Sequence, residues 1–200
     1  WIMPPGYSAL PTLYLNDIVD YPKLAVLKGS TVEVHLYGES GSYTLRETLS
    51  DRNSQPALKE KPKQIFQVVQ AGRIDIKGPT SAEFDIALSP DDPPLVSWDG
   101  KFETDHYGES TFSFKAGDDF GVVSGLAQVD LDIANLERKY GLTASPRKNS
   151  PILVDLPLPF NGPRLEFTGK VVKDFSKSVW ANLPVKITLK AKDAVGQMGK

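Results

Sequence analysis

Residues 115–121 read Lys-Ala-Gly-Asp-Asp-Phe-Gly, and residues 190–196 repeat the pattern as Lys-Ala-Lys-Asp-Ala-Val-Gly. Each copy follows a stretch in which apolar residues occur at every second position, as in a strand with one buried face. Within each copy, an Asp is followed three residues later by a Gly. An Asp side chain can accept hydrogen bonds from the backbone of a turn, and Gly readily adopts a positive φ. The repeat therefore predicts two strands of β-sandwich modules that leave their sheets through tight turns.

The same alternation occurs along the rest of the chain, with turn signals about every 8–12 residues, which is typical of a sandwich. The strands that we predict are residues 31–37, 43–49, 64–70, 73–77, 82–88, 95–98, 111–116, 125–133, 152–156, 164–172 and 183–191. Residues 1–15, which contain three Pro, are interpreted as an edge strand or an extended lead-in. The core side chains that we predict are Val32, Val34, Leu36, Phe84, Ile86, Leu88, Phe112, Phe114, Val129, Leu131, Ile187 and Leu189.

A proline-rich segment at residues 89–94, Ser-Pro-Asp-Asp-Pro-Pro, divides the chain near its midpoint. Proline at this density favours a stiff, extended linker. We therefore predict an all-β protein made of two tandem immunoglobulin-like β-sandwich domains, residues 1–92 and 93–200. Only residues 134–140 have a helical pattern, and Gly141 would end that short turn.

The composition excludes several kinds of site. The net charge is −2, so the basic excess of a phosphate-binding surface is missing and we expect no nucleic-acid partner. The sequence contains no Cys, which excludes disulfides and zinc–thiolate sites. It also has no run of about 18 apolar residues, so membrane contact would require segments that this chain does not contain. Because the chain begins at Trp1 rather than at Met, we read it as a segment of a longer protein.

Several short motifs occur in an order that resembles a known family. They are Trp-Ile-x-Pro-Pro-x-Tyr at residues 1–7, Leu-Lys-Gly-Ser at 27–30, Pro-Asp-Asp-Pro-Pro at 90–94, Asp-Asp-Phe-Gly-Val at 118–122, Trp-Ala-x-Leu-Pro-Val at 180–185 and Ala-x-Asp-Ala-x-Gly-Gln at 191–197. In this order they are similar to large alphaproteobacterial inner-membrane proteins of unknown function. The resemblance implies a periplasmic location and a tether to the inner membrane. That family has no established activity, so the resemblance assigns no catalytic residue.

Groups suited to catalysis are sparse. The two His residues, His35 and His106, each lie just before a Tyr-Gly-Glu-Ser tetrapeptide, and the sequence lacks the Gly-x-Ser-x-Gly pattern of a nucleophile elbow. We interpret both tetrapeptides as turns, and a site that contains Ser40 or Ser110 is the alternative. We therefore expect neither enzymatic activity nor a cofactor.

Acidic residues at strand ends suggest another use. Asp91 and Asp92 lie in the linker, and Asp118 and Asp119 lie in the first copy of the repeat, where their oxygens could bind Ca²⁺. Asp193 in the second copy would lie at the opposite end of the second sandwich if the last strand runs antiparallel to the first. The spacing matches no dedicated calcium loop, so we interpret these Asp residues as caps of turns.

Two surfaces could bind a partner. Trp98 and Trp180, together with Tyr107, could stack on sugar rings, although a Trp in a small sandwich usually fills a core. Residues 150–163 combine apolar residues with four Pro, which is typical of an edge strand to which a partner could add a strand. The residues that we predict for this contact are Ile152, Val154 and Leu156.

These observations together favour a non-catalytic module of a membrane-anchored envelope protein. It would act as a periplasmic spacer or would bind another protein of the cell envelope. Binding of carbohydrate or cell-wall glycan through exposed aromatic side chains is the alternative. Whether Trp98 and Trp180 are exposed and roughly coplanar discriminates between the two, and burial of both would exclude the alternative.

Overall fold

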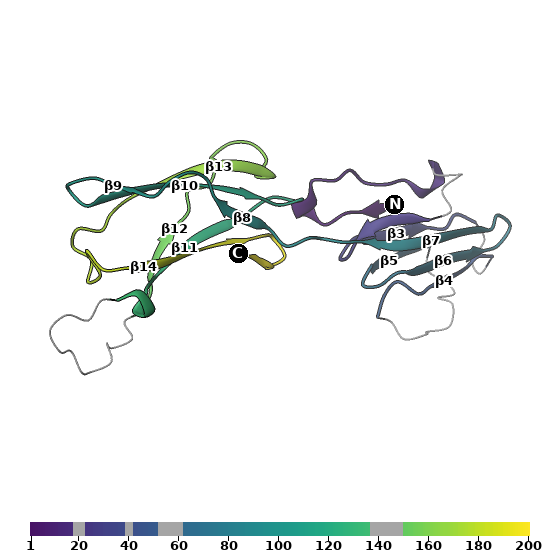
Figure 1. Cartoon of the computed structure of the whole chain (residues 1–200). Coiled ribbons are helices and arrows are strands. Elements are labelled where there is room, and N and C mark those ends of the chain that lie inside the picture. The colour runs from purple at the N-terminus through teal and green to yellow at the C-terminus, as the bar shows by residue number, and fades with distance from the viewer. Residues whose placement is uncertain (18–22, 39–41, 52–61, 137–149) are drawn as a thin grey trace. The chain divides into compact units, whose positions relative to one another are not determined.

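The regular structure of the described residues consists of strands β1 to β15 and three short 3₁₀ helices, so the all-β prediction is confirmed. The chain divides into two units, Trp1–Asp91 and Asp92–Lys200, and each contains two sheets (Figure 1). Among the described residues, no helix is long and apolar enough to cross a membrane. The residues that this computed structural model describes are 1–17, 23–38, 42–51, 62–136 and 150–200.

The first unit packs a three-stranded sheet against a four-stranded sheet. The smaller sheet has the order β1-β3-β5, and its pairs are antiparallel. The larger sheet has the order β2-β7-β6-β4, in which β2 runs parallel to β7. The elements of this unit are β1 Ile2–Met3, η1 Gly6–Ser8, η2 Leu15–Asp17, β2 Leu24–Leu27, β3 Thr31–His35, β4 Thr44–Glu47, β5 Lys63–Gln67, β6 Gly72–Lys77 and β7 Ala82–Ser89.

Alternation along these strands forms the first core. Val32 of the smaller sheet and Ile74 and Ile86 of the larger sheet belong to one buried cluster. Leu88 was predicted to point into this core but is 36% exposed. Strand β6 begins at Gly72, opposite Ile86, so beyond that point Leu88 has only β2 beside it.

The second unit is also a sandwich, and all of its strand pairs are antiparallel. One sheet has the order β13-β10-β8, with β9 beside β10, and the other has the order β12-β11-β14-β15. In Figure 1, β10 and β13 lie in one layer, and β11 and β14 lie in the other. The elements of this unit are β8 Leu95–Trp98, β9 Glu103–Thr104, β10 Glu109–Gly117, β11 Ser124–Leu131, η3 Ile133–Asn135, β12 Ile152–Asp155, β13 Glu166–Asp174, β14 Val185–Lys192 and β15 Met198–Gly199.

Two phenylalanines of β10 form the centre of the second core. Phe112 and Phe114 are fully buried, in one cluster with Ala127 and Leu189 of the opposite sheet. Opposite Phe114 on β13 lies Gly169, where a Cβ atom would be only 2.4 Å from the Phe114 ring. The ring thus occupies the space that any other residue at position 169 would need.

The turns of the repeat have the conformation that the sequence predicts. The Phe120 N–H donates a hydrogen bond to Oδ2 of Asp118 at 3.1 Å, and Gly121 has a φ of 103°. In the second copy, the Gly196 N–H donates to Oδ1 of Asp193 at 2.6 Å, and Gly196 has a φ of 98°. Both Asp residues therefore cap their own turns, and both glycines occupy the left-handed region that favours Gly.

Both copies lie at the same end of the second sandwich. Gly117, at the end of β10, pairs with Leu95, at the start of β8. Lys192, at the end of β14, pairs with Ser124, which begins β11 only a short loop after β10. The expectation that Asp193 lies at the opposite end is therefore wrong, because a last strand antiparallel to the first ends where the first begins.

The described residues do not test every predicted feature. The helical turn predicted at residues 134–140 falls partly on η3, and residues 137–149 lie outside the described residues. Strands β2, β9 and β15 were not predicted. The description of both units as immunoglobulin-like domains, with a boundary between residues 92 and 93, stays a prediction.

Candidate binding site

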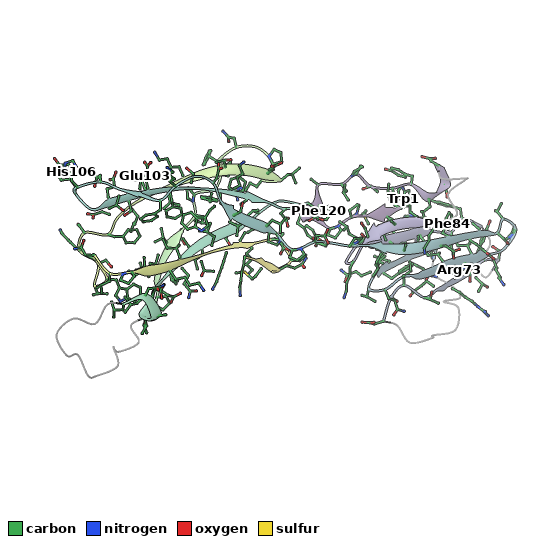
Figure 2. The ribbon with its side chains drawn as sticks, viewed as in Figure 1. Trp1, Arg73, Phe84, Glu103, His106 and Phe120 are labelled. Carbon is green, nitrogen blue, oxygen red and sulfur yellow. The ribbon has the colours of Figure 1, made fainter. Side chains whose placement is uncertain are left out.

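A cavity of about 510 Å³ lies between the two sheets at one end of the second unit. Its walls include the turn at residues 105–108, the loop at residues 175–183 and parts of β11, β12 and β14. Much of the lining is aromatic, from Phe102, Tyr107, Phe175 and Trp180. In Figure 2, His106 marks this end of the second unit. Concave sites of this size, with apolar walls and a few polar groups, are typical of ligand-binding pockets.

The turn at residues 105–108 is fixed by its own sequence. Oδ1 of Asp105 accepts a hydrogen bond from the Tyr107 N–H at 2.9 Å, as in the two copies of the repeat. Gly108 has a φ of 91°, and its carbonyl oxygen accepts a hydrogen bond from the Phe175 N–H at 3.1 Å. The turn is thereby held against the loop that follows β13, and these two segments form one end of the cavity.

Trp180 contributes an unpaired donor to this region. It is 5% exposed, and its Nε1–H has no hydrogen-bond partner among the described residues. A buried indole N–H normally has an acceptor, so this donor is an unsatisfied polar group of the second unit. The hydroxyl groups of Ser110 and Thr104, with their oxygens 2.9 Å apart, also line the cavity. A ligand here would meet aromatic walls and two hydroxyl groups.

The two tryptophans proposed for sugar stacking have different environments. Trp180 is buried, whereas Trp98 is 41% exposed and does not line the cavity. The Trp98 ring packs on Phe112, with ring centroids 4.8 Å apart. The two rings therefore do not form one exposed platform. The aromatic residues that line the cavity with Trp180 had not been predicted, apart from Tyr107.

His106 and Ser110 both line the cavity. The His106 ring packs against the Tyr107 ring with centroids 3.9 Å apart, and the Ser110 hydroxyl pairs with Thr104. In the described part of the chain, no hydrogen bond joins His106 to Ser110, so the pair lacks the contact that activates a nucleophile. The equivalent Ser40 lies outside the described residues.

Strand β12 lies at the edge of its sheet. In an antiparallel pair, residues alternate between positions whose N–H and C=O groups face the partner strand and positions whose groups face away. The Leu156 N–H donates to the Gly125 carbonyl at 3.0 Å, so Leu156 and, by alternation, Val154 face β11. The backbone groups of Leu153 and Asp155 therefore face outward.

The residues predicted for the edge contact divide into two groups. Val154 and Leu156 are buried in the second core, so a partner would not reach their side chains. Ile152 lines the cavity together with Trp180. The exposed apolar side chain on this edge is Leu153, at 57% exposure, and it was missed because we selected the residues on the opposite face.

The acidic residues considered for Ca²⁺ have different environments. Asp91 accepts a hydrogen bond from a tyrosine hydroxyl at 3.1 Å, and Asp92 is exposed. Burial raises the pKa of Asp118, and the charges of Asp119 and Asp193 raise it further. In the part of the chain that the structure describes, no group of three or more His, Cys, Asp or Glu side chains could hold a metal ion.

Comparison with known proteins gives a family but no activity. No curated protein matches the chain. The model of a domain of unknown function, DUF4175, matches residues 1–200, which is the whole chain. The chain therefore belongs to the DUF4175 family, whose function is unknown.

Proposed function

We propose that this chain is a non-catalytic module that binds a protein of the cell envelope through the free edge of β12. The observation that carries the proposal is the outward-facing backbone of Leu153 and Asp155. An extended segment of a partner would add a strand there, and its backbone would pair with these N–H and C=O groups. The exposed Leu153 side chain would contact the partner. The two sandwiches would act as a spacer that presents this edge.

Prolines limit the edge on both sides. Pro151 precedes β12 and Pro157 follows it closely, and neither has an N–H group to donate. The edge is therefore the four residues Ile152–Asp155. A short edge between prolines resists unspecific pairing, which favours a partner that contributes one short strand.

We infer a periplasmic location, with a tether to the inner membrane through segments outside this chain. The support is the order of short motifs that resembles large inner-membrane proteins of alphaproteobacteria. In such a parent protein, rigid β-sandwiches would hold the β12 edge at a set distance from the membrane.

Site-specific photo-crosslinking tests the proposal. A photo-reactive residue in place of Asp155, in the membrane-anchored parent, is expected to capture a defined envelope protein. Leu153→Pro removes an outward N–H that the pairing with β11 does not use, so it should abolish the crosslink and leave the melting temperature nearly unchanged. A crosslink that persists in Leu153→Pro, or recovery of glycan without protein, contradicts the proposal.

A matched variant shows whether the loss is specific. Val154→Pro removes an N–H that faces β11, so it should lower the melting temperature as well as the crosslink. Leu153→Thr keeps the backbone donor and shortens the apolar side chain. It should weaken the crosslink only in part, because the backbone groups remain.

Glycan binding is the second candidate, and the cavity is the observation that favours it. Its aromatic walls suit stacking on a sugar ring, and the hydroxyl groups of Thr104 and Ser110 suit hydrogen bonds to it. Titration of the chain with soluble cell-wall oligosaccharides should then change the tryptophan fluorescence, because Trp180 lines the cavity. Phe102→Ala, which removes one exposed aromatic wall of the cavity, should weaken binding roughly three- to tenfold. Absence of binding at millimolar oligosaccharide removes this candidate.

A further inference from the structure

Each copy of the repeat leaves one carboxylate oxygen buried and unpaired. Asp118 uses Oδ2 to cap its turn, whereas Oδ1 is buried and has no partner among the described residues. Asp193 uses Oδ1 to accept two turn N–H groups, whereas Oδ2 is buried and equally without a partner. Asp193 as a whole is 4% exposed. Turn capping therefore explains one oxygen of each side chain and leaves the other unexplained.

The fold brings the two carboxylates to one place. The Val123 N–H, just after the first copy, donates to the carbonyl oxygen of Lys192 at 2.8 Å, directly before Asp193. Burial raises the pKa of Asp118, and the negative charges of Asp119 and Asp193 raise this pKa further, so Asp193 is close enough to act on Asp118. In Figure 2, Phe120 in the first copy lies at the opposite end of the second unit from His106. The pair of carboxylates is thus separate from the cavity.

No basic side chain pairs with Asp118 or Asp193 in the described residues. Basic residues near the ends of β10 and β14 and in the loop before β13 have other contacts or are exposed: Lys115 pairs with Asp99, Lys190 donates to Gln128, Arg164 donates to the Pro159 carbonyl and Lys192 is exposed. Buried carboxylates without a positive partner are unfavourable, and a bound ion or water is one way to satisfy an unpaired buried oxygen.

We propose that Asp118 and Asp193 bind a divalent cation, Ca²⁺, between the two copies of the repeat. Ca²⁺ takes roughly six to eight oxygens in flexible geometry, so backbone carbonyls and water can complete a set that begins with two carboxylates. Two carboxylates are few, so the dissociation constant is expected near 10⁻⁴–10⁻³ M, about that of extracellular modules. The ion joins the end of β10 to the end of β14, and it therefore fastens the two sheets where the chain enters the second unit.

Thermal unfolding with and without Ca²⁺ tests this site. About 10 mM CaCl₂ should raise the melting temperature of the second unit by roughly 6–12 °C relative to EDTA. Asp118→Asn and Asp193→Asn each retain an acceptor oxygen for the turn and remove the negative charge, so each should abolish the rise. Titration calorimetry with CaCl₂ should give one site in the wild type and none in these variants.

Asp105→Asn is the matched control. Asp105 caps an Asp-x-x-Gly turn of the same form, but it is exposed and lies at the cavity end of the unit. This variant should keep the full response to Ca²⁺. If Asp193→Asn fails to fold, Asp118→Asn still decides the question, because Asp118 is less buried.

Three results would overturn the proposal. One is a wild-type chain that binds no Ca²⁺ and does not become more stable in its presence. Another is an undiminished response in both Asn variants, because the ion would then bind elsewhere. The third is a second unit that becomes more stable as the pH falls but ignores Ca²⁺, since a proton would then satisfy the carboxylates.

Discussion

The two sandwiches differ in how completely their polar groups are paired. In the first unit, Glu33 pairs with His35 on its own strand, β3, and with Lys63 on the adjacent strand, β5. Among the described residues, the first unit has one buried side-chain atom without a hydrogen-bond partner, Asp75 Oδ1. The second unit has three such atoms: Asp118 Oδ1, Trp180 Nε1 and Asp193 Oδ2. Two units of the same fold class thus differ in the number of buried polar atoms that lack a hydrogen-bond partner. The second unit is where a ligand or an ion would satisfy unpaired groups.

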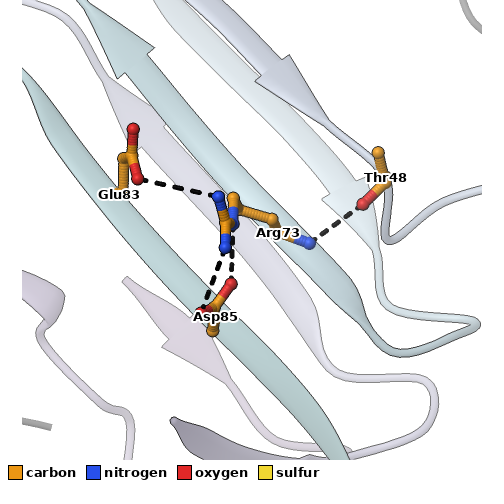
Figure 3. A network of polar contacts seen from close by, with 4 residues as sticks. All are labelled: Thr48, Arg73, Glu83 and Asp85. Carbon is orange, nitrogen blue, oxygen red and sulfur yellow. Dashed lines mark hydrogen bonds and ion pairs between the residues drawn. The ribbon is translucent and has the colours of Figure 1, made fainter. Parts of the chain in front are cut away.

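The polar network on the first unit shows the contrast. Arg73 of β6 donates through Nε to Oδ1 of Asp85 on β7 at 2.7 Å, and its guanidinium lies 3.7 Å from Glu83 (Figure 3). Its backbone N–H donates to Oγ1 of Thr48 at 2.9 Å. These side chains are exposed, and exposed ion pairs add little stability. The network thus pairs charged side chains of β6 and β7 on the surface of the sheet.

The largest effect that we predict tests whether the units unfold separately. Phe114→Ala empties the centre of the second core and should reduce the free energy of unfolding of the second unit by about 3–5 kcal/mol. Urea denaturation followed by tryptophan fluorescence can resolve this, because Trp98 and Trp180 lie in the second unit and Trp1 lies in the first. An equal loss in both transitions would show that the two units unfold as one.

A smaller effect tests the packing that sets the second core apart. Gly169→Ala places a Cβ atom 2.4 Å from the Phe114 ring, and this overpacking should destabilise the second unit by about 1–3 kcal/mol. Gly6→Ala in the first unit is the matched control, because nothing lies within 4 Å of a Cβ atom there. Equal stabilities of the two variants in urea would mean that the ring moves aside freely.

The features that the sequence predicted are those set by local rules. Alternation of apolar residues predicted the long strands, such as β7 and β10, because successive side chains of a strand point to opposite faces. The repeat predicted the capped turns at Asp118 and Asp193, because the hydrogen bonds of such a turn span only a few residues.

The features that were missed depend on distant segments. Strand β2, with the continuous apolar sequence Leu-Ala-Val-Leu, is defined by its parallel partner β7, about 60 residues later in the chain. The cavity takes side chains from several separate segments, and neither Phe102 nor Phe175 has a local signal that marks it as lining a site. Likewise, Leu153 was missed because alternation alone does not show which face of an edge strand is buried.

The smallest effect that we predict is a difference between the two units in how their stability depends on pH. Hydrogen bonds from Lys63 and His35 lower the pKa of Glu33 below its ordinary value. The folded-state pKa is thus below the unfolded value of about 4.3, so Glu33 stabilises the first unit above that pH and loses this effect as the pH falls through the folded pKa. Glu33→Gln should therefore reduce the acid-induced loss of stability in the transition that Trp1 reports, and leave the second unit unchanged. If the variant and the wild type lose stability equally in acid, the ion pairs of the first unit contribute nothing, and the contrast between the units is confined to the unpaired atoms of the second.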